Sequence, residues 1–253
     1  MSARRRRFYD AFCGKLENIS VEAIEGMYLR ALSVGYNACI PCLVIRPLLD
    51  LQEIRKNVAN ARAIVDSLLD RGLKVYLRCH LAGISKAEVK KVLPRIRGMC
   101  DLVSVEGTTR EMLAFASRDR RIDIITLIPG SSPKLYKGDI DYILKYGKFV
   151  EVTASSFLTE DLLLLARNIS SVRSLLLQPA RKKVPILLSS GEGGLKDPRS
   201  LLAFAELLLG LDVESVARSA SALIEKRLAE NLEKRMGIRP IEGVRIERPI
   251  DEI

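Results

Sequence analysis

Polar side chains that could carry acid–base or electrostatic chemistry alternate with apolar residues along several strand-like segments of this 253-residue chain. Segments 74–80, 101–106 and 149–153 each place valine, leucine or cysteine on one face and polar residues on the other. Because successive side chains of a strand point to opposite faces, the polar set should share one interior. That set comprises Asp10, Arg78, His80, Glu106, Glu151 and Ser189.

Two interpretations of this polar set compete. Enzymes built on barrels of alternating strands and helices place their chemistry at the carboxyl ends of the strands, so the set could be an active site. It could equally be a buried ion-pair network, in which Arg78 is flanked by carboxylates that offset the cost of removing its charge from water. We favour the network.

A metal-dependent hydrolase would need several imidazoles and carboxylates around one ion, and the chain has a single histidine. Phosphoesterases of the polymerase-and-histidinol-phosphatase type carry Asp-x-His-x-His at their first strand, whereas Asp10 is followed here by Ala-Phe-Cys-Gly. The Cys39–Cys42 pair lies in an apolar strand, where residues three apart face opposite sides. We therefore expect neither a metal nor another cofactor in the protein itself.

The five cysteines and the glycine-rich turn at 189–194 carry weak signals. Five is an odd number, and the spacing is irregular, which favours reduced thiols over a disulfide framework. The turn follows a strand and precedes a helix, where backbone amides could hold a phosphate, but it matches no nucleotide-binding fingerprint. Its glycines are equally explained as turn residues.

The elements that must position these residues alternate between strand and helix. Segments rich in β-favouring residues are each followed by an amphipathic stretch, a pattern typical of parallel strands joined by crossover helices. Helices should begin near Val21, Asp50, Lys86, Thr109, Asp139, Thr159 and Pro198, with a long one at 213–235 and a capping box from Ser85 to Glu88. The strands should cover 8–13, 37–45, 74–80, 101–106, 123–128, 149–153 and 184–189.

Seven or eight such units predict an α/β fold, a closed TIM-like (β/α) barrel. We expect a single barrel domain over residues 8–235, a basic N-terminal arm over 1–7 and a C-terminal tail over 236–253, where Gly and Pro interrupt the pattern. The chain has no stretch of about twenty apolar residues and no secretory signal, so we expect a cytoplasmic protein without a membrane anchor.

A net charge of +10 points to an anionic partner. The charge remains +6 without the arginines at positions 4–7, so the excess belongs to the folded body. Basic clusters lie at 86–97, 118–121 and 181–183. Aromatic residues make up only 5% and tryptophan is absent, which argues against base stacking as the main mode of binding. Recognition of the phosphate backbone and shape of a folded RNA remains.

The second half of the chain resembles a known family. The matching segments are Phe-Val-Glu-Val-Thr-Ala-Ser-Ser-Phe-Leu at 149–158, Arg167, Val-Pro-Ile-Leu-Leu-Ser-Ser-Gly at 184–191, Lys196-x-Pro198, Leu-Leu-Leu-Gly-Leu at 207–211, and Ala217, Ser221, Asn231 and Arg235. With a looser likeness upstream, this pattern resembles the component-3 protein of archaeal ribonuclease P. Glu192 and Ser200 depart from the family pattern, which commonly has alanine and aspartate there.

This resemblance implies a barrel related to the polymerase-and-histidinol-phosphatase barrels but without their metal ligands. It implies a subunit that assists a catalytic RNA in removing the 5′ leader of precursor tRNA, with Mg²⁺ bound by that RNA. The implied partners are the ribonuclease P RNA, precursor tRNA, the small component-2 protein and other ribonuclease P proteins. As RNA-facing residues near loops or element ends we select Arg46, Arg78, Lys137, Arg167, Lys196 and Arg199.

Two alternative functions stay open at this point. A barrel hydrolase or aldolase-like enzyme could use Asp10, Glu106, Glu151 and His80 on a small phosphorylated substrate. A general RNA chaperone would use the same basic surface without preference for one RNA.

Overall fold

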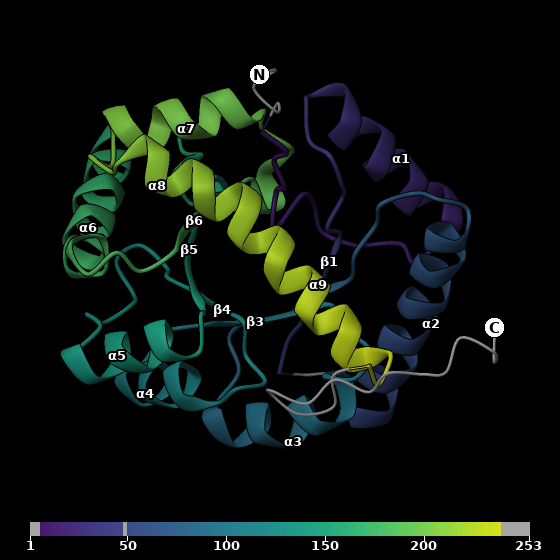
Figure 1. Ribbon diagram of the computed structural model, residues 1–253. Coiled ribbons are helices and arrows are strands. Elements are labelled where there is room, and N and C mark those ends of the chain that lie inside the picture. The colour runs from purple at the N-terminus through teal and green to yellow at the C-terminus, as the bar shows by residue number, and fades with distance from the viewer. Residues whose placement is uncertain (1–5, 48–49, 239–253) are drawn as a thin grey trace.

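Strands and helices alternate throughout the computed structural model, which describes residues 6–47 and 50–238. Six parallel strands form one sheet in the order of the chain, and the helices surround it (Figure 1). The strands are β1 (Cys42–Ile45), β2 (Arg78–Leu81), β3 (Leu102–Glu106), β4 (Ile124–Thr126), β5 (Phe149–Thr153) and β6 (Ile186–Ser189). The predicted class, a TIM-like α/β barrel with parallel strands, is confirmed.

The helices begin close to the positions that the sequence predicts. They are α1 (Val21–Ser33), α2 (Leu51–Asp70), α3 (Lys86–Ile96), α4 (Arg110–Arg118), α5 (Lys137–Lys145), α6 (Leu162–Arg181), α7 (Pro198–Leu207), α8 (Val213–Arg218) and α9 (Ile224–Arg235). The capping box of Ser85 and Glu88 is present, and each side chain accepts a backbone N–H of the other residue. The helix expected to begin near Thr159 is α6, and its N-cap is Asp161.

The segment at residues 8–16 closes the barrel without forming a regular strand. On one side it pairs with the β1 region, where the Cys42 N–H donates to Gly14 O at 2.9 Å and the Leu16 N–H donates to Cys42 O at 2.8 Å. On the other side the Gly191 N–H, just after β6, donates to Phe12 O at 3.1 Å. The predicted strand at 8–13 therefore occupies the place of a barrel strand, but the structure assigns it no continuous ladder.

Two of the predicted strands begin four or five residues later in the structure than the sequence predicts. The segment at 37–45 contributes an isolated bridge at Cys39 and then β1, with Pro41 between them. Proline has no backbone N–H to donate, so the ladder is interrupted there. The neighbouring strand, expected at 74–80, bridges Cys39 through Val75 and becomes regular only at Arg78.

The apolar residues pack in two layers. The larger cluster lies between strands and surrounding helices and includes the strand residues Val75, Leu77, Val103, Val105, Val150 and Val152, as the alternation predicts. A second cluster fills one end of the barrel, where Leu102, Ile124 and Phe149 meet Ile224 and Leu228 of α9. Figure 1 shows α9 running across this end of the barrel. The helix expected at 213–235 is therefore α8 and α9, joined by a π-helical turn, Ser219–Leu223.

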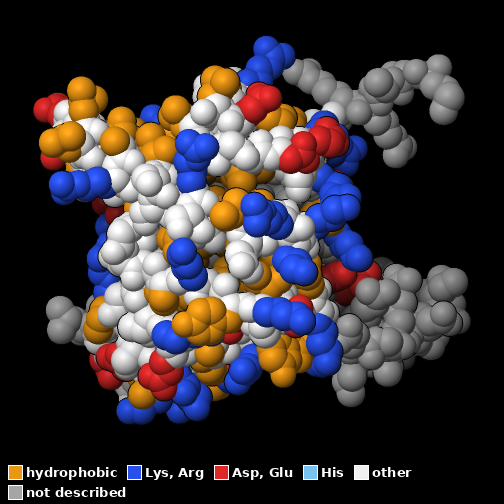
Figure 2. All heavy atoms as spheres, turned by 90° about the vertical axis from the view of Figure 1, so that its left-hand side faces the viewer, with side chains coloured by type: hydrophobic (Ala, Val, Ile, Leu, Met, Phe, Trp, Pro, Cys, Tyr) orange, Lys and Arg blue, Asp and Glu red, His pale blue; other side chains and the backbone are white. Residues whose placement is uncertain are grey.

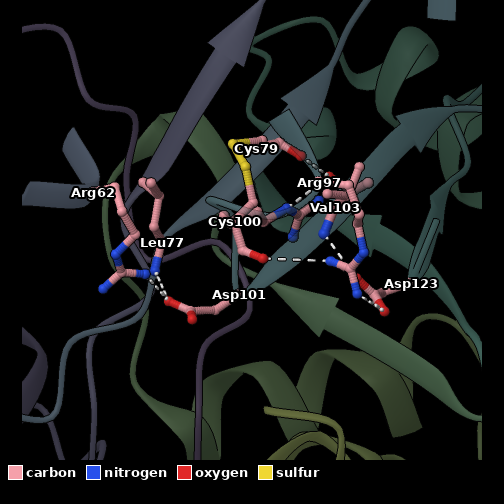
Figure 3. Close-up of a disulfide and its surroundings, with 10 residues drawn as sticks. Arg62, Leu77, Cys79, Arg97, Cys100, Asp101, Val103 and Asp123 are labelled. Atoms are coloured by element: carbon pink, nitrogen blue, oxygen red, sulfur yellow. Dashed lines mark hydrogen bonds and ion pairs between the residues drawn. A yellow bond between two sulfur atoms is a disulfide. The ribbon is translucent and has the colours of Figure 1, made fainter. Parts of the chain in front are cut away.

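A disulfide joins Cys79 to Cys100, contrary to the expectation of reduced thiols (Figure 3). Cys79 lies on β2 with its side chain under the helices, and Cys100 lies just before β3. Parallel pairing of β2 with β3 brings these two positions together although 21 residues separate them. Cysteine spacing cannot indicate this pairing, because it depends on the crossover through α3.

The remaining cysteines are buried, as expected from their apolar surroundings. Cys39 faces Cys13, with 2.7 Å between the two Sγ atoms, whereas Cys42 lies toward Arg78 and Glu151. The residues 1–5 of the predicted N-terminal arm and 239–253 of the predicted tail lie outside the described residues. Among described residues, no helix is long and apolar enough to cross a membrane.

Candidate nucleic-acid interface

A buried ion pair occupies the middle of the barrel. The Arg78 side chain is 0% exposed, and its guanidinium donates to the two carboxylate oxygens of Glu151 at 2.5 and 2.6 Å. The other guanidinium N–H groups donate to Ser104 Oγ at 2.8 Å and Ala11 O at 2.9 Å. The ring of Phe12 lies 5.0 Å from the guanidinium carbon. Arg78 is thus held from every side by the protein itself.

Glu151 is equally well satisfied. It accepts hydrogen bonds from the hydroxyls of Thr126 and Ser189, both at 2.7 Å. Burial acts to raise the pKa of Glu151, but the charge and hydrogen bonds of Arg78, together with these hydroxyls, lower it to about 2. The pair is charged at neutral pH and needs no ligand to explain it, in agreement with the ion-pair network that the alternating pattern predicts.

His80 and Glu106 lie nearer the carboxyl ends of the strands. The Nδ1 atom of His80 is 2.8 Å from Ser104 Oγ, and its Nε2 atom is 3.6 Å from Glu106 Oε1. Glu106 also accepts the backbone N–H of Gly83 at 2.8 Å. Against the effect of burial, the hydrogen bond and charge of His80 lower the pKa of Glu106. These contacts connect the loop after β2 to the end of β3.

Asp10 ties the N-terminal segment to the end of β6. Its carboxylate accepts the backbone N–H of Phe12 at 3.0 Å and that of Ser190 at 3.1 Å. Burial raises the pKa of Asp10 to about 6, against the effect of these hydrogen bonds. Asp10 therefore has a structural task in closing the barrel.

The alternative of a barrel hydrolase receives no support from this geometry. Asp10, Glu106, Glu151 and His80 are each engaged by protein groups. Within residues 6–47 and 50–238, no group of three or more His, Cys, Asp or Glu side chains could hold a metal ion. The interior is a packed core.

Five of the six residues selected as RNA-facing lie on the surface. Arg46 follows β1, Lys137 begins α5, Lys196 and Arg199 lie between β6 and the first turn of α7, and Arg167 lies on α6. Arg46 is 3.5 Å from Glu192 in the turn after β6, so this ion pair brings the loops after β1 and β6 together. Lys137 and Arg167 are on separate helices. These five surface residues therefore lie around the carboxyl ends of the strands and on the helices beside that end of the barrel.

The selection of Arg78 is wrong. A fully buried guanidinium that already binds Glu151 cannot contact RNA, because exposing it would break the ion pair and leave a carboxylate without its partner in the core. The strand alternation that placed Arg78 inside the barrel was the correct guide to its position.

Sequence reasoning missed a surface on which arginines stack against tyrosines. The guanidinium carbons of Arg110, Arg118 and Arg120 lie 4.4, 5.3 and 4.9 Å from the ring centroids of Tyr136, Tyr142 and Tyr146, in that order. We call these six residues the tyrosine–arginine face. The sequence contains part of the signal for this face, since residues 118–121 are a basic cluster and Tyr142 and Tyr146 are four residues apart, a spacing that places two side chains on the same side of a helix.

The side of the molecule that carries α5, α6 and α7 is shown in Figure 2. Lysine and arginine side chains gather along its lower and right-hand parts, where they alternate with hydrophobic side chains. Acidic side chains are fewer and lie mostly at the corners of this view. The surface can therefore attract a polyanion over a broad area.

Fold and site together define a (β/α) barrel whose interior holds a structural ion pair and whose surface is basic. Residues 19–236 match the family model described as RNase P subunit p30. The chain belongs to this family, and it is a protein subunit of ribonuclease P, a tRNA-processing ribonucleoprotein enzyme. The expectation from the sequence resemblance is confirmed.

Individual relatives agree with this assignment. The chain is 24% identical over 183 residues to ribonuclease P protein component 3 of Methanopyrus kandleri. This alignment covers 70% of this chain and 71% of that protein. Among solved structures, a chain of archaeal ribonuclease P with mature tRNA superposes with a TM-score of 0.61 at 16% identity, covering 89% of this chain and 94% of the other. Aspergillus niger ochratoxinase gives a TM-score of 0.50 at 12% identity, covering 80% and 64%. These two structures show the shared fold.

Proposed function

We propose that this chain binds the catalytic RNA of ribonuclease P and assists it in removing the 5′ leader of precursor tRNA. The observation that carries the proposal is the family match over residues 19–236. The ion-pair core supports it, because the carboxylates that a protein catalyst would need are committed to holding the barrel together. In this proposal the chemistry belongs to Mg²⁺ bound by the RNA, and the protein contributes no catalytic group.

The physical task of the protein is to offset charge repulsion in the RNA. Segments of a folded RNA repel each other through their phosphates, and a basic protein surface lowers that repulsion when it displaces condensed cations. Arg46, Lys137, Arg167, Lys196 and Arg199 are exposed or half-exposed and able to do this. The protein should therefore lower the Mg²⁺ concentration at which the RNA becomes active.

The partners that fit this role are the ribonuclease P RNA, precursor tRNA, the small component-2 protein and other ribonuclease P proteins. The relative from Methanopyrus kandleri is itself named as a ribonuclease P component, which supports assembly with such partners. We place the protein in the cytoplasm with its RNA.

Reconstitution tests the proposal. Cleavage of a precursor tRNA by an archaeal ribonuclease P RNA is measured at limiting Mg²⁺ without protein, with component 2 alone, and with component 2 and this chain. We expect the complete mixture to cleave at Mg²⁺ concentrations where the RNA alone is inactive. Equal rates with and without this chain, at every Mg²⁺ concentration, would contradict the assisting role.

A further inference from the structure

Contacts between cations and aromatic rings are concentrated on one side of this barrel. Seven such contacts occur among the described residues, and one of them is Arg78 over Phe12 inside the barrel. The other six all lie on α3, α4, α5, the loop after α4 and the loops that flank α5. Three of these six contacts share the ring of Tyr146, so positive charge is concentrated around this tyrosine.

The packing of α4 against α5 creates this arrangement. Tyr142 lies on α5 and Tyr146 caps its C-terminal end, four residues later, and their rings lie 6.0 Å apart at 24°. Arg118 ends α4 and Arg120 follows it, so both guanidiniums reach over these rings. Lys145 adds a third positive charge, 5.8 Å from the centre of the Tyr146 ring.

The same face carries an excess of positive charge. Within residues 110–148, seven lysines and arginines are exposed or half-exposed, against the three acidic residues Glu111, Asp119 and Asp141. Two of those acids already have partners, since Glu111 binds Lys86 at 2.7 Å and Asp119 binds Arg121 at 2.6 Å, and of the seven basic residues Arg110 is paired with the buried Asp139. Among the ion pairs of the described residues, none involves Arg118 or Lys145, so their charges are not neutralised by the protein. An anionic partner is the one that this surface fits.

Stacking on a ring prepares an arginine for binding phosphate. A guanidinium held over a tyrosine ring loses less freedom when it binds, and its planar N–H edge matches the oxygens of a phosphodiester. The surface continues past α4 into a shallow groove of about 450 Å³ lined by residues that include Lys86, Lys90 and Arg118. Lys90 lies 5.8 Å from the centre of the Phe115 ring in this groove.

We propose that the tyrosine–arginine face, extended by Lys90 and Lys145, binds the phosphodiester backbone of a folded RNA. The inference rests on the proposed function and adds a location to it, since of the five surface residues selected from the sequence only Lys137 lies within residues 110–148. Binding is through charge, with the tyrosines acting as positioning residues that hold the arginines in place. The bases of the RNA are not read.

Paired substitutions test the location. The variant Arg118→Ala/Lys145→Ala removes two charges that make no ion pair on this face. Its matched control, Arg55→Ala/Lys56→Ala, removes two exposed charges on α2, on the other side of the barrel (Figure 1). Affinity for a fluorescein-labelled ribonuclease P RNA is measured by anisotropy from 50 to 300 mM KCl, and circular-dichroism melting verifies that the variants are folded.

We expect the Arg118/Lys145 variant to bind about tenfold more weakly at 100 mM KCl. The plot of log affinity against log salt should become flatter by about 1.4–1.8, because each phosphate contact contributes roughly 0.7–0.9 to its slope. The α2 control should keep the wild-type slope. A folded Arg118/Lys145 variant with the wild-type slope overturns the location but leaves the RNA-binding function standing, whereas a wild-type chain that does not bind the RNA overturns both.

A second series tests the positioning role of tyrosine. Tyr142→Leu keeps an apolar side chain but loses the ring under Arg118, and should weaken binding about two- to fivefold without changing the salt slope. Tyr142→Phe keeps the ring and should bind like the wild type. Equal affinity of the leucine and phenylalanine variants would show that the ring does not position Arg118.

Discussion

Arg78 and Glu151 are charged residues of a kind found in active sites, but here they form a structural ion pair in the core. Both side chains are fully buried, and together they engage Ser104, Thr126 and Ser189 on neighbouring strands. Breaking a buried ion pair is costly because it leaves one charge without a partner, whereas replacing the whole pair by apolar residues often costs little. The main effect of the pair is therefore to fix the arrangement of the neighbouring strands, and its net contribution to the free energy of unfolding is small.

This gives a prediction for Glu151. The substitution Glu151→Gln should lower the free energy of unfolding by about 3–5 kcal/mol, since the Arg78 charge stays buried without its counter-ion. Guanidinium denaturation at pH 7 measures the loss. The double variant Arg78→Met/Glu151→Leu should recover most of it, and a Glu151→Gln protein as stable as the wild type would contradict the structural role of the pair.

Asp10 should make stability depend on pH. Burial raises its pKa in the folded chain from 3.8 to about 6, so the folded state binds the proton more tightly than the unfolded state does. Its contribution is fully present below about pH 4 and is lost as the pH rises through 6, a change of up to about 3 kcal/mol. As the pH rises from 4 to 7, the denaturation midpoint of the wild type should fall relative to that of the Asp10→Asn variant. The asparagine side chain can still accept hydrogen bonds from the same backbone N–H groups. Parallel pH profiles would refute this assignment.

At the scale of elements, the β2–α3–β3 unit is held by more than strand pairing. The Cys79–Cys100 disulfide closes it, and Asp101 accepts the Leu77 N–H at 2.7 Å while binding Arg62 of α2 (Figure 3). Asp123 has the same place before β4, where it accepts the Val103 N–H at 2.9 Å. Each carboxylate thus ties the start of its own strand to the preceding one.

The disulfide should contribute measurably to stability. It closes a loop of 21 residues, and a cross-link of that length stabilises by about 3 kcal/mol, chiefly by restricting the unfolded chain. Adding a phosphine reductant to the unfolding reaction should therefore lower the midpoint of the wild type. The variant Cys100→Ala should begin at the lower midpoint and be insensitive to the reductant. A wild-type midpoint that reductant leaves unchanged would argue against this contribution.

The elements also show what a sequence can and cannot indicate. Strand alternation placed Glu151 and Arg78 inside correctly, because it depends only on neighbouring residues. Partners fixed by tertiary packing were not visible: Lys148 is buried and donates to the carbonyls of Ala116 and Asp119 at 2.6 and 2.5 Å, at the end of α4. Surface arginines were selected by their nearness to loops, a criterion that finds exposure but not the tyrosines beneath them.

For the whole molecule, charge is the property that connects fold with function. Lysine and arginine ordinarily keep their charge well above neutral pH and supply the +10 of this chain, although burial lowers the pKa of Lys148 to about 7. Affinity for ribonuclease P RNA should therefore be nearly constant between pH 6 and 9 and should fall steeply with salt. Anisotropy titrations at fixed ionic strength measure the first expectation. A large loss of affinity across that pH range would point to a titrating group in the interface instead.

The closure of the barrel by residues 8–16 has a consequence for how the protein is made. Asp10 meets the backbone of Ser190 across 180 residues, so residues 8–16 are made long before their partners at the end of β6 exist. Contacts so distant in sequence slow folding, because a long loop must be closed before they stabilise anything. Until β6 and the turn after it are made, the side of residues 8–16 that later faces Gly191 stays uncovered, which makes the nascent chain prone to aggregation.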